Sequence, residues 1–286
     1  MASFPGPLLN KLTTLTLLHT VSTGKRHLII EALHKKYGVF VRTGPNTLSI
    51  NSLEAVGPIY SSAQCFNRSE GYRPGRFGDN SLFFIRDRQR HNIRRRELMR
   101  NGDPEGIIAG AQKAMMQFEI SFLLGYHDEE QKEALRDEDL NMDAVFAIEA
   151  GLARVVPKDG VVLVNRYIPG GTIVSVPAYA QEVSPENFWP APLEFRPERW
   201  LEGGLGPDSI LRPGALICFS FGPFGCLGRQ LAMRELHLAV AQLVLSYDIT
   251  LAPAFNEELF MDGVRNIKTT LFKFPLLVQA TVRKTI

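Results

Sequence analysis

The chain has 286 residues, of which 45% are hydrophobic and 22% are charged, a composition typical of a globular domain that can bury a sizeable core. Its formal net charge of +2 gives no reason to expect a nucleic-acid-binding protein or a trap for acidic substrates. Cys65, Cys218 and Cys226 form no Cys-x-x-Cys pair, which excludes a disulfide framework and favours a reducing compartment.

The N-terminal hundred residues predict helices around a small sheet. The first 22 residues suit neither a membrane span nor a signal peptide, because prolines and polar residues interrupt them. From Lys25 to Tyr37, apolar residues recur at helical spacing, which predicts an amphipathic helix. Val39–Val41 and Thr47–Ile50 predict two strands joined by a turn at Gly44-Pro45-Asn46, and Ser52 is a candidate N-cap of a following helix.

The range Arg86 to Arg100 holds seven arginines in fifteen residues and predicts a strongly basic helix. Such a charge run is most often an exposed helix face, and a nucleic-acid or protein interaction surface is an alternative. A narrower interpretation rests on His91 and Arg95, which lie four residues apart on one helix face. Both side chains could donate hydrogen bonds to one anionic group.

Residues 101–150 carry weaker patterns. Asn101–Glu105 forms a short polar break, and a helix is expected to end near Phe122–Leu124. An acidic, helix-favouring run follows from His127 to Asp139. Within it, Glu133 and Arg136 are interpreted as part of an exposed charged helix.

The last third of the chain predicts strands and one long helix. Val161–Val164 and Thr172–Val176 are expected to be strands around a turn at Pro169-Gly170-Gly171. Leu227 to Ser246 predicts an amphipathic helix with a broad apolar surface, most of which we expect in the core. Thr269 to Val282 alternates like a strand.

A lone cysteine, Cys226, lies in a Gly/Pro loop directly before that long helix. The positive end of a helix dipole stabilises a thiolate over a thiol, and a thiolate is a good metal ligand. Gly222, Gly225 and Gly228 remove side chains around the sulfur, which allows a tight turn and the close approach of a flat ligand. The alternative is a buried cysteine in an ordinary strand-to-helix loop.

The spacing Phe219-x-x-Gly222-x-x-x-Cys226-x-Gly228 resembles the haem-ligand loop of the cytochrome P450 family. The resemblance implies that the Cys226 thiolate is the fifth ligand of iron in haem b, and that the other three residues shape the haem-binding loop. Phe224 departs from the pattern, because many members carry a basic residue there. One contact with a haem carboxylate is therefore expected to be lost.

The resemblance assigns further haem contacts. The segment IRDRQRHNIRRR is similar to the family helix whose paired residues bind haem propionates, here His91 and Arg95. Arg154 matches a third propionate ligand, and a charge at a strand edge is the alternative. The surrounding arginines match the basic proximal face that receives an NADPH-dependent reductase.

Two other family elements are altered. Ile107–Gly110 resembles the distal helix, but Gln112 and Lys113 stand where an acid-threonine pair would deliver protons to dioxygen. No proton-delivery residue is therefore assigned. FWPAPLEFRPERW resembles the family's meander, and its Arg199 should pair with a Glu-x-x-Arg segment of which Glu149 would be the remnant. Arg199 is accordingly expected to be unpaired.

The expected fold is mainly α with small β-sheets, an incomplete P450-like fold in one domain spanning residues 1–286. Residues 1–100 would form the N-terminal sheet and basic helix, residues 101–150 reduced distal and acidic helices, and residues 151–286 the sheet, meander, cysteine loop, proximal helix and C-terminal hairpin. The FPGP at Phe4–Pro7 resembles the hinge that follows a membrane anchor. The family is expected on the cytosolic face of the endoplasmic reticulum, and this chain, lacking the anchor, is expected to be cytoplasmic or peripheral.

The function implied is a haem-thiolate monooxygenase that inserts one oxygen atom from dioxygen into a small apolar organic substrate. A truncated relative that binds haem without monooxygenase turnover is the alternative, because several helices that the resemblance implies after Met99 are missing. A basic-helix interaction module would explain the arginines and leave the cysteine loop unexplained. No nucleic-acid partner is expected.

Overall fold

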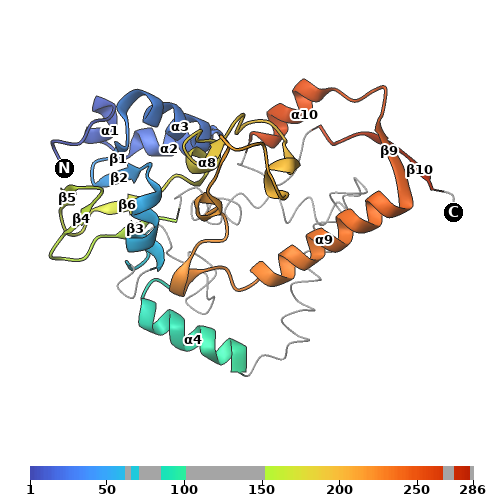
Figure 1. Cartoon of the computed structure of the whole chain (residues 1–286). Helices are drawn as coiled ribbons and strands as arrows, with labels where there is room; N and C mark the ends of the chain where they lie inside the picture. The colour runs from blue at the N-terminus through green and yellow to red at the C-terminus, as the bar shows by residue number, and fades with distance from the viewer. Residues whose placement is uncertain (62–65, 71–84, 101–151, 267–273, 284–286) are drawn as a thin grey trace, which may run out of the picture.

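The structure is a computed structural model that describes residues 1–61, 66–70, 85–100, 152–266 and 274–283. This described part is helical in places and carries several small sheets (Figure 1). Within these ranges, no helix has the length and apolar character needed to cross a membrane.

The N-terminal elements follow the sequence closely. The predicted amphipathic helix and two strands are confirmed, with boundaries shifted by one to three residues, whereas Ser52 precedes only a short 3-10 turn and makes no side-chain cap. Two additional helices precede the amphipathic one, and a π-helix follows the 3-10 turn. The elements are α1 (Leu8–Leu12), α2 (Leu15–Ser22), α3 (Arg26–Tyr37), β1 (Phe40–Gly44), β2 (Thr47–Ile50), η1 (Leu53–Ala55), the π-helix η2 (Gly57–Ser61) and α4 (Arg88–Arg100).

One four-stranded sheet, in the order β1-β2-β6-β3, joins segments more than a hundred residues apart. Strand β6 (Ile173–Ser175) lies parallel to β2, and the short strand β3 (Arg154–Val155) runs antiparallel to β6. Between them, β4 (Val161–Leu163) and β5 (Arg166–Ile168) form a separate hairpin. The prediction of two strands around Pro169–Gly171 was therefore incomplete, because the chain already reverses at Val164 and Asn165, which both adopt positive φ as a primed hairpin turn requires.

The core lies over this sheet. Leu48, Ile50 and Val174 from the strands are fully buried, and Tyr60 of η2 packs with them. The Tyr60 hydroxyl accepts a hydrogen bond of 2.9 Å from the Val176 backbone N–H, which satisfies a buried polar group. Ile217, a few residues before the cysteine loop, belongs to the same cluster. The loop is thus rooted in the sheet core.

The C-terminal elements begin beside that core, with one short helix packed on α3, and continue into a long helix and a two-stranded hairpin that extend away from it (Figure 1). They are α8 (Ala178–Glu182), β7 (Phe188–Trp189), η5 (Pro197–Trp200), β8 (Ile210–Leu211), η6 (Pro213–Ala215), η7 (Gly222–Phe224), α9 (Arg229–Ser246), β9 (Tyr247–Leu251), α10 (Glu257–Val264) and β10 (Val278–Val282). The long helix and the terminal strand are confirmed, and β10 pairs antiparallel with β9. The expected burial of α9 is wrong, because none of its side chains is buried and no described element covers its apolar face.

Candidate functional site

The cysteine loop is closed by its own backbone. The Cys226 N–H donates to the Phe219 carbonyl at 2.8 Å, and the Gly225 N–H donates to the Gly222 carbonyl at 3.0 Å. Gly222 has φ +61°, and a Cβ added there would lie 2.5 Å from the Tyr60 carbonyl oxygen. Only glycine suits this combination of a left-handed backbone and a close approach, so the loop is held tightly against η2.

The Cys226 thiol is free and exposed at the start of α9. Gly228 is the residue before the helix, and a Cβ added there would lie 4.0 Å from the Cys226 sulfur. The alternative of a buried cysteine is therefore wrong, because the loop holds the sulfur at the surface. Cys218 is also free, whereas Cys65 lies outside the described residues.

Helix α4 brings two of the expected residues to this loop. The Arg95 Nη1 donates to the Gly225 carbonyl at 2.6 Å, one residue before the cysteine. The His91 ring is buried, with 2% of its surface exposed, and its centroid lies 4.7 Å from that of Phe224. The predicted sharing of one helix face by His91 and Arg95 is thus consistent with both side chains reaching the same loop.

The third expected residue, Arg154, meets them from strand β3. Its side chain is 1% exposed, and Nη1 donates to the carbonyls of Leu152 and Ala153. The guanidinium lies 5.0 Å from the Phe224 ring centroid and 5.1 Å from that of Tyr60. Arg154 thus lies on an outer strand of the sheet, but its side chain is buried and turns inward over these two rings. Its role as a propionate ligand stays a prediction.

Arg68 is a member of this cluster that the sequence did not indicate. Its backbone pairs with Arg154 in an isolated bridge, and its side chain is 6% exposed. The guanidinium lies 4.5 Å from the Phe224 ring centroid. Many family members carry a basic residue at the position of Phe224. Its absence is a signal that another segment could supply the cation, but no spacing rule points to Arg68.

The cluster is strongly positive around a neutral imidazole. Burial, together with the nearby charges of Arg68, Arg95 and Arg154, lowers the pKa of His91 to about 4. His91 Nδ1 is shielded from solvent and has no hydrogen-bond partner among the described residues. Buried polar atoms normally form hydrogen bonds. A ring nitrogen without a partner beside several guanidinium groups therefore suits an anionic ligand.

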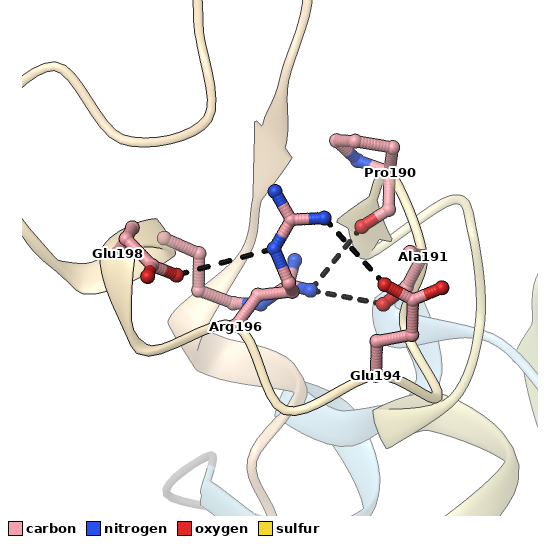
Figure 2. Close-up of polar contacts among 6 residues, drawn as sticks. Pro190, Ala191, Glu194, Arg196 and Glu198 are labelled. Atoms are coloured by element: carbon pink, nitrogen blue, oxygen red, sulfur yellow. Dashed lines mark hydrogen bonds and ion pairs between the residues drawn. The ribbon is translucent and has the colours of Figure 1, made fainter.

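Arg199 of the meander forms hydrogen bonds within its own loop. Arg199 is buried and its Nη2 donates to the carbonyls of Pro190 and Ala191 at 3.2 and 3.1 Å. Neighbouring Arg196 pairs with Glu194 at 3.5 Å and with Glu198 at 3.9 Å (Figure 2). Carbonyls of its own loop accept hydrogen bonds from Arg199 Nη2, whereas its Nη1 has no hydrogen-bond partner among the described residues. That Arg199 lacks an acidic partner stays a prediction, because Glu149 lies outside the described residues.

Five further residues that were interpreted from the sequence lie outside the described residues. They are Gln112, Lys113, Glu133, Arg136 and Glu149. The site within the described ranges consequently consists of an exposed thiol, a glycine-shaped loop and a buried cationic cluster.

Comparisons with known proteins agree with this arrangement. The model of the family described as Cytochrome P450 matches residues 132–274, half of the chain. Cytochrome P450 monooxygenase orf5 of Eupenicillium brefeldianum is 39% identical over 176 residues, which cover 59% of this chain and 34% of the relative. Cytochrome P450 monooxygenase hepD of Aspergillus oryzae is 48% identical over 104 residues, which cover 36% of this chain and 20% of the relative.

The chain thus spans about a third or less of the curated relatives it matches. The family model nevertheless covers the meander, the cysteine loop and α9, the segments that present the thiol. Sequence, local geometry and the family match agree, and the chain belongs to the cytochrome P450 family.

Proposed function

We propose that this chain is a haem-thiolate protein that inserts one oxygen atom from dioxygen into a small apolar organic substrate. The observation that carries the proposal is the convergence of His91, Arg95 and Arg154 on the loop that exposes Cys226. Both of these relatives are named as monooxygenases, which supports the reaction class.

The residues present fit haem b. The Cys226 thiol is open to a ligand, and the unpartnered Nδ1 of His91 lies beside cationic groups that suit the haem carboxylates. Cys226 would ligate the iron, whereas His91, Arg95 and Arg154 would bind the two propionates. When bound, the haem would supply the activation of dioxygen, and the thiolate would promote cleavage of the O–O bond.

The protein's own contribution is to orient the thiolate. The Phe219 carbonyl accepts a hydrogen bond from the Cys226 N–H, and Arg95 donates one to the Gly225 carbonyl. Gly222 allows the loop to approach Tyr60 closely. These contacts fix the direction of the sulfur before any ligand arrives, which reduces the entropic cost of ligation. Gly228 leaves the space beside the sulfur free of a side chain.

A second candidate is a haem-binding relative without monooxygenase turnover. Two observations favour it: Gln112 and Lys113 stand where the family carries its acid-threonine pair, and α9 exposes its apolar face. Under this proposal residues 1–286 are one incomplete domain, in which residues 101–150 replace a larger distal part. Product formation from an apolar substrate with reductase and NADPH separates the two candidates.

The reductase would bind the basic surface of α4. Arg90, Arg94 and Arg96 are exposed on this helix, and complementary acidic surfaces would associate through them. Turnover or reduction rates should therefore fall steeply with ionic strength. A rate independent of salt would argue against this docking surface.

We place the chain peripherally on the cytosolic face of the endoplasmic reticulum. Five leucines of α1 and α2 are 47–78% exposed, namely Leu8, Leu9, Leu12, Leu15 and Leu18. No acidic residue precedes Glu31, whereas Lys11, Lys25 and Arg26 do. An apolar surface among basic residues suits the interface of an anionic membrane. Cosedimentation with phosphatidylcholine/phosphatidylserine vesicles should be lost when Leu8 and Leu12 are replaced by serine.

The decisive experiment is the absorption spectrum of the reduced, carbon monoxide-treated protein after reconstitution with haem. The wild type should give the strongly red-shifted Soret band of thiolate-ligated ferrous haem. Cys226→Ala should lose this band, whereas Cys218→Ala, which removes the other free exposed cysteine among the described residues, should keep it. A conventional Soret band in the wild type, or an unchanged band in Cys226→Ala, would refute thiolate ligation by Cys226.

A further inference from the structure

A pocket of about 540 Å³ lies beside the cationic cluster. Among described residues, three segments line it: 66–68, 86–89 and 155–158. None of them belongs to the cysteine loop. Arg68 borders both places, because it lines the pocket while its guanidinium lies over Phe224.

Backbone and side-chain hydrogen bonds fix the three segments together. The Val155 N–H donates to the Asn67 carbonyl at 2.9 Å, and the Arg68 N–H donates to the Arg86 carbonyl at 3.3 Å. The Arg88 N–H donates to Asn67 Oδ1 at 3.2 Å. The walls are therefore part of the folded scaffold, so the shape exists before a ligand binds.

The lining carries four cationic side chains and one carboxylate. Arg68, Arg86, Arg88 and Lys158 supply the positive charges, and Asp87 is the acidic residue. Asp87 Oδ1 already accepts the Arg90 N–H at 2.8 Å, as an N-cap of α4. Arg86 Nε is shielded from solvent and lacks a hydrogen-bond partner among the described residues. The lining therefore carries a net positive charge and several hydrogen-bond donors, which suit an anion with several acceptor oxygens.

A phosphate group matches these properties. Its tetrahedral oxygens accept hydrogen bonds from several directions, as donors from three separate segments require. The helix α4 begins at Arg88, so its positive end adds to the field at the pocket. The pocket also falls in the ordinary size range for small-molecule sites, roughly 300–1,000 Å³, and leaves room for a substituent on the phosphate.

We propose that this pocket binds a phosphate group, either as inorganic phosphate or as a phosphomonoester, independently of haem. Arg86 and Lys158 contribute the contacts at two of its three walls. The site is separate from the proposed contacts of His91, Arg95 and Arg154 with haem carboxylates.

Isothermal titration of the full chain with sodium phosphate, at ionic strength held constant with sodium chloride, tests the proposal. Phenyl phosphate in a parallel titration distinguishes the two sources, because tighter binding identifies a phosphomonoester and equal binding identifies the phosphate group alone. Arg86→Gln should weaken binding about tenfold, the loss expected for one charge-assisted hydrogen bond. The double variant with Lys158→Gln should abolish saturable binding.

Arg90→Gln is the matched control, because it removes one arginine charge from the start of α4, where the side chain does not line the pocket. It should retain the wild-type affinity within about twofold, because its side chain is exposed, makes no part of the lining and is screened by solvent and salt. Absence of saturable binding in the wild type, or an equal loss in Arg90→Gln, would overturn the proposal. Lys158 is an exposed side chain, so Lys158→Gln alone provides the test if Arg86→Gln does not fold.

Repeating the titration on haem-loaded protein separates this site from the proposed function. Phosphate affinity should be unchanged when the Soret band shows that haem is bound. Competition between phosphate and haem would overturn the proposal, because the pocket would then belong to the haem site. If the chain binds no haem at all, the titration of the chain as purified still decides the phosphate site.

Discussion

The four-stranded sheet and the C-terminal unit of α9, β9 and β10 use similar apolar residues with opposite results. In the sheet, Leu48, Ile50 and Val174 are 0% exposed. In the C-terminal unit, Leu238 is 62% and Ile249 is 43% exposed, and no residue of α9, β9 or β10 is buried. Local hydrogen bonding is therefore enough to form the helices and strands of both regions. Burial of their apolar side chains requires a second packed layer.

The cysteine loop connects these two regions. Ile217 and Gly222 attach its beginning to the sheet core and to η2, and its end leads into the exposed α9 (Figure 1). The geometry around Cys226 thus depends mainly on the buried region. A change in the sheet should disturb the site more than an equivalent change in α9.

The largest difference should come from one leucine in each region. Leu48→Ala removes a fully buried side chain and should lower the free energy of unfolding by about 2–5 kcal/mol. Leu238→Ala removes an exposed side chain and should change it by about 0.5 kcal/mol or less. Urea unfolding followed by circular dichroism measures both. Equal losses would show that α9 is covered in solution.

A smaller effect is expected at the junction itself. Gly222→Ala places a Cβ in a left-handed backbone and 2.5 Å from the Tyr60 carbonyl, so it should cost more than the roughly 1–2 kcal/mol of the backbone strain alone. Gly203→Ala is the matched control, because its φ is +80° and nothing lies within 4 Å of the added Cβ. Urea midpoints compare the two variants. If both lose the same stability, the contact with η2 is unimportant.

The buried region should also depend on pH through His34. Its Nδ1 contacts the Gly38 carbonyl at 2.8 Å and its Nε2 contacts the Ser49 hydroxyl at 2.7 Å, and burial lowers its pKa. The folded chain then binds fewer protons than the unfolded chain, so stability should fall as pH drops below about 6.5, the ordinary histidine value.

His34→Gln tests this contribution. Urea midpoints should fall less between pH 7.5 and pH 5 in the variant than in the wild type, because the replaced group no longer titrates. The exposed His19→Gln should retain the wild-type slope. A variant slope as steep as the wild-type slope would assign the pH dependence to other groups.

Local patterns predicted most of the elements but not their packing. The helix at Arg26–Tyr37 and the strand at Thr47–Ile50 follow from periodicity over a few residues. The parallel pairing of β2 with β6 joins residues about 125 positions apart, and no local pattern determines it. The exposure of α9 was missed for the same reason, because an apolar face predicts burial only when a partner element is present.

The candidate site shows the same limit. The spacing of His91 and Arg95 and the glycines around Cys226 were visible in the sequence because each set lies on one element. Arg68 was not, since it reaches Phe224 from a segment more than 150 residues earlier in the chain. The acceptors of Arg199 were not anticipated, because they are backbone carbonyls, which a side-chain motif does not reveal.

The smallest effect concerns the one described ion pair that joins α10 to the N-terminal region. Lys25 Nζ lies 2.6 Å from Asp262 Oδ1, and the hydrogen bond with Lys25 lowers the pKa of Asp262. Both side chains are exposed, so solvent screens the pair and the entropy of ordering two flexible groups opposes it. Asp262→Asn should therefore leave the urea midpoint of the sheet region unchanged at low and high salt. A clear loss at low salt that disappears at high salt would show that this pair holds α10 against the sheet region, and α10 would then unfold together with the sheet.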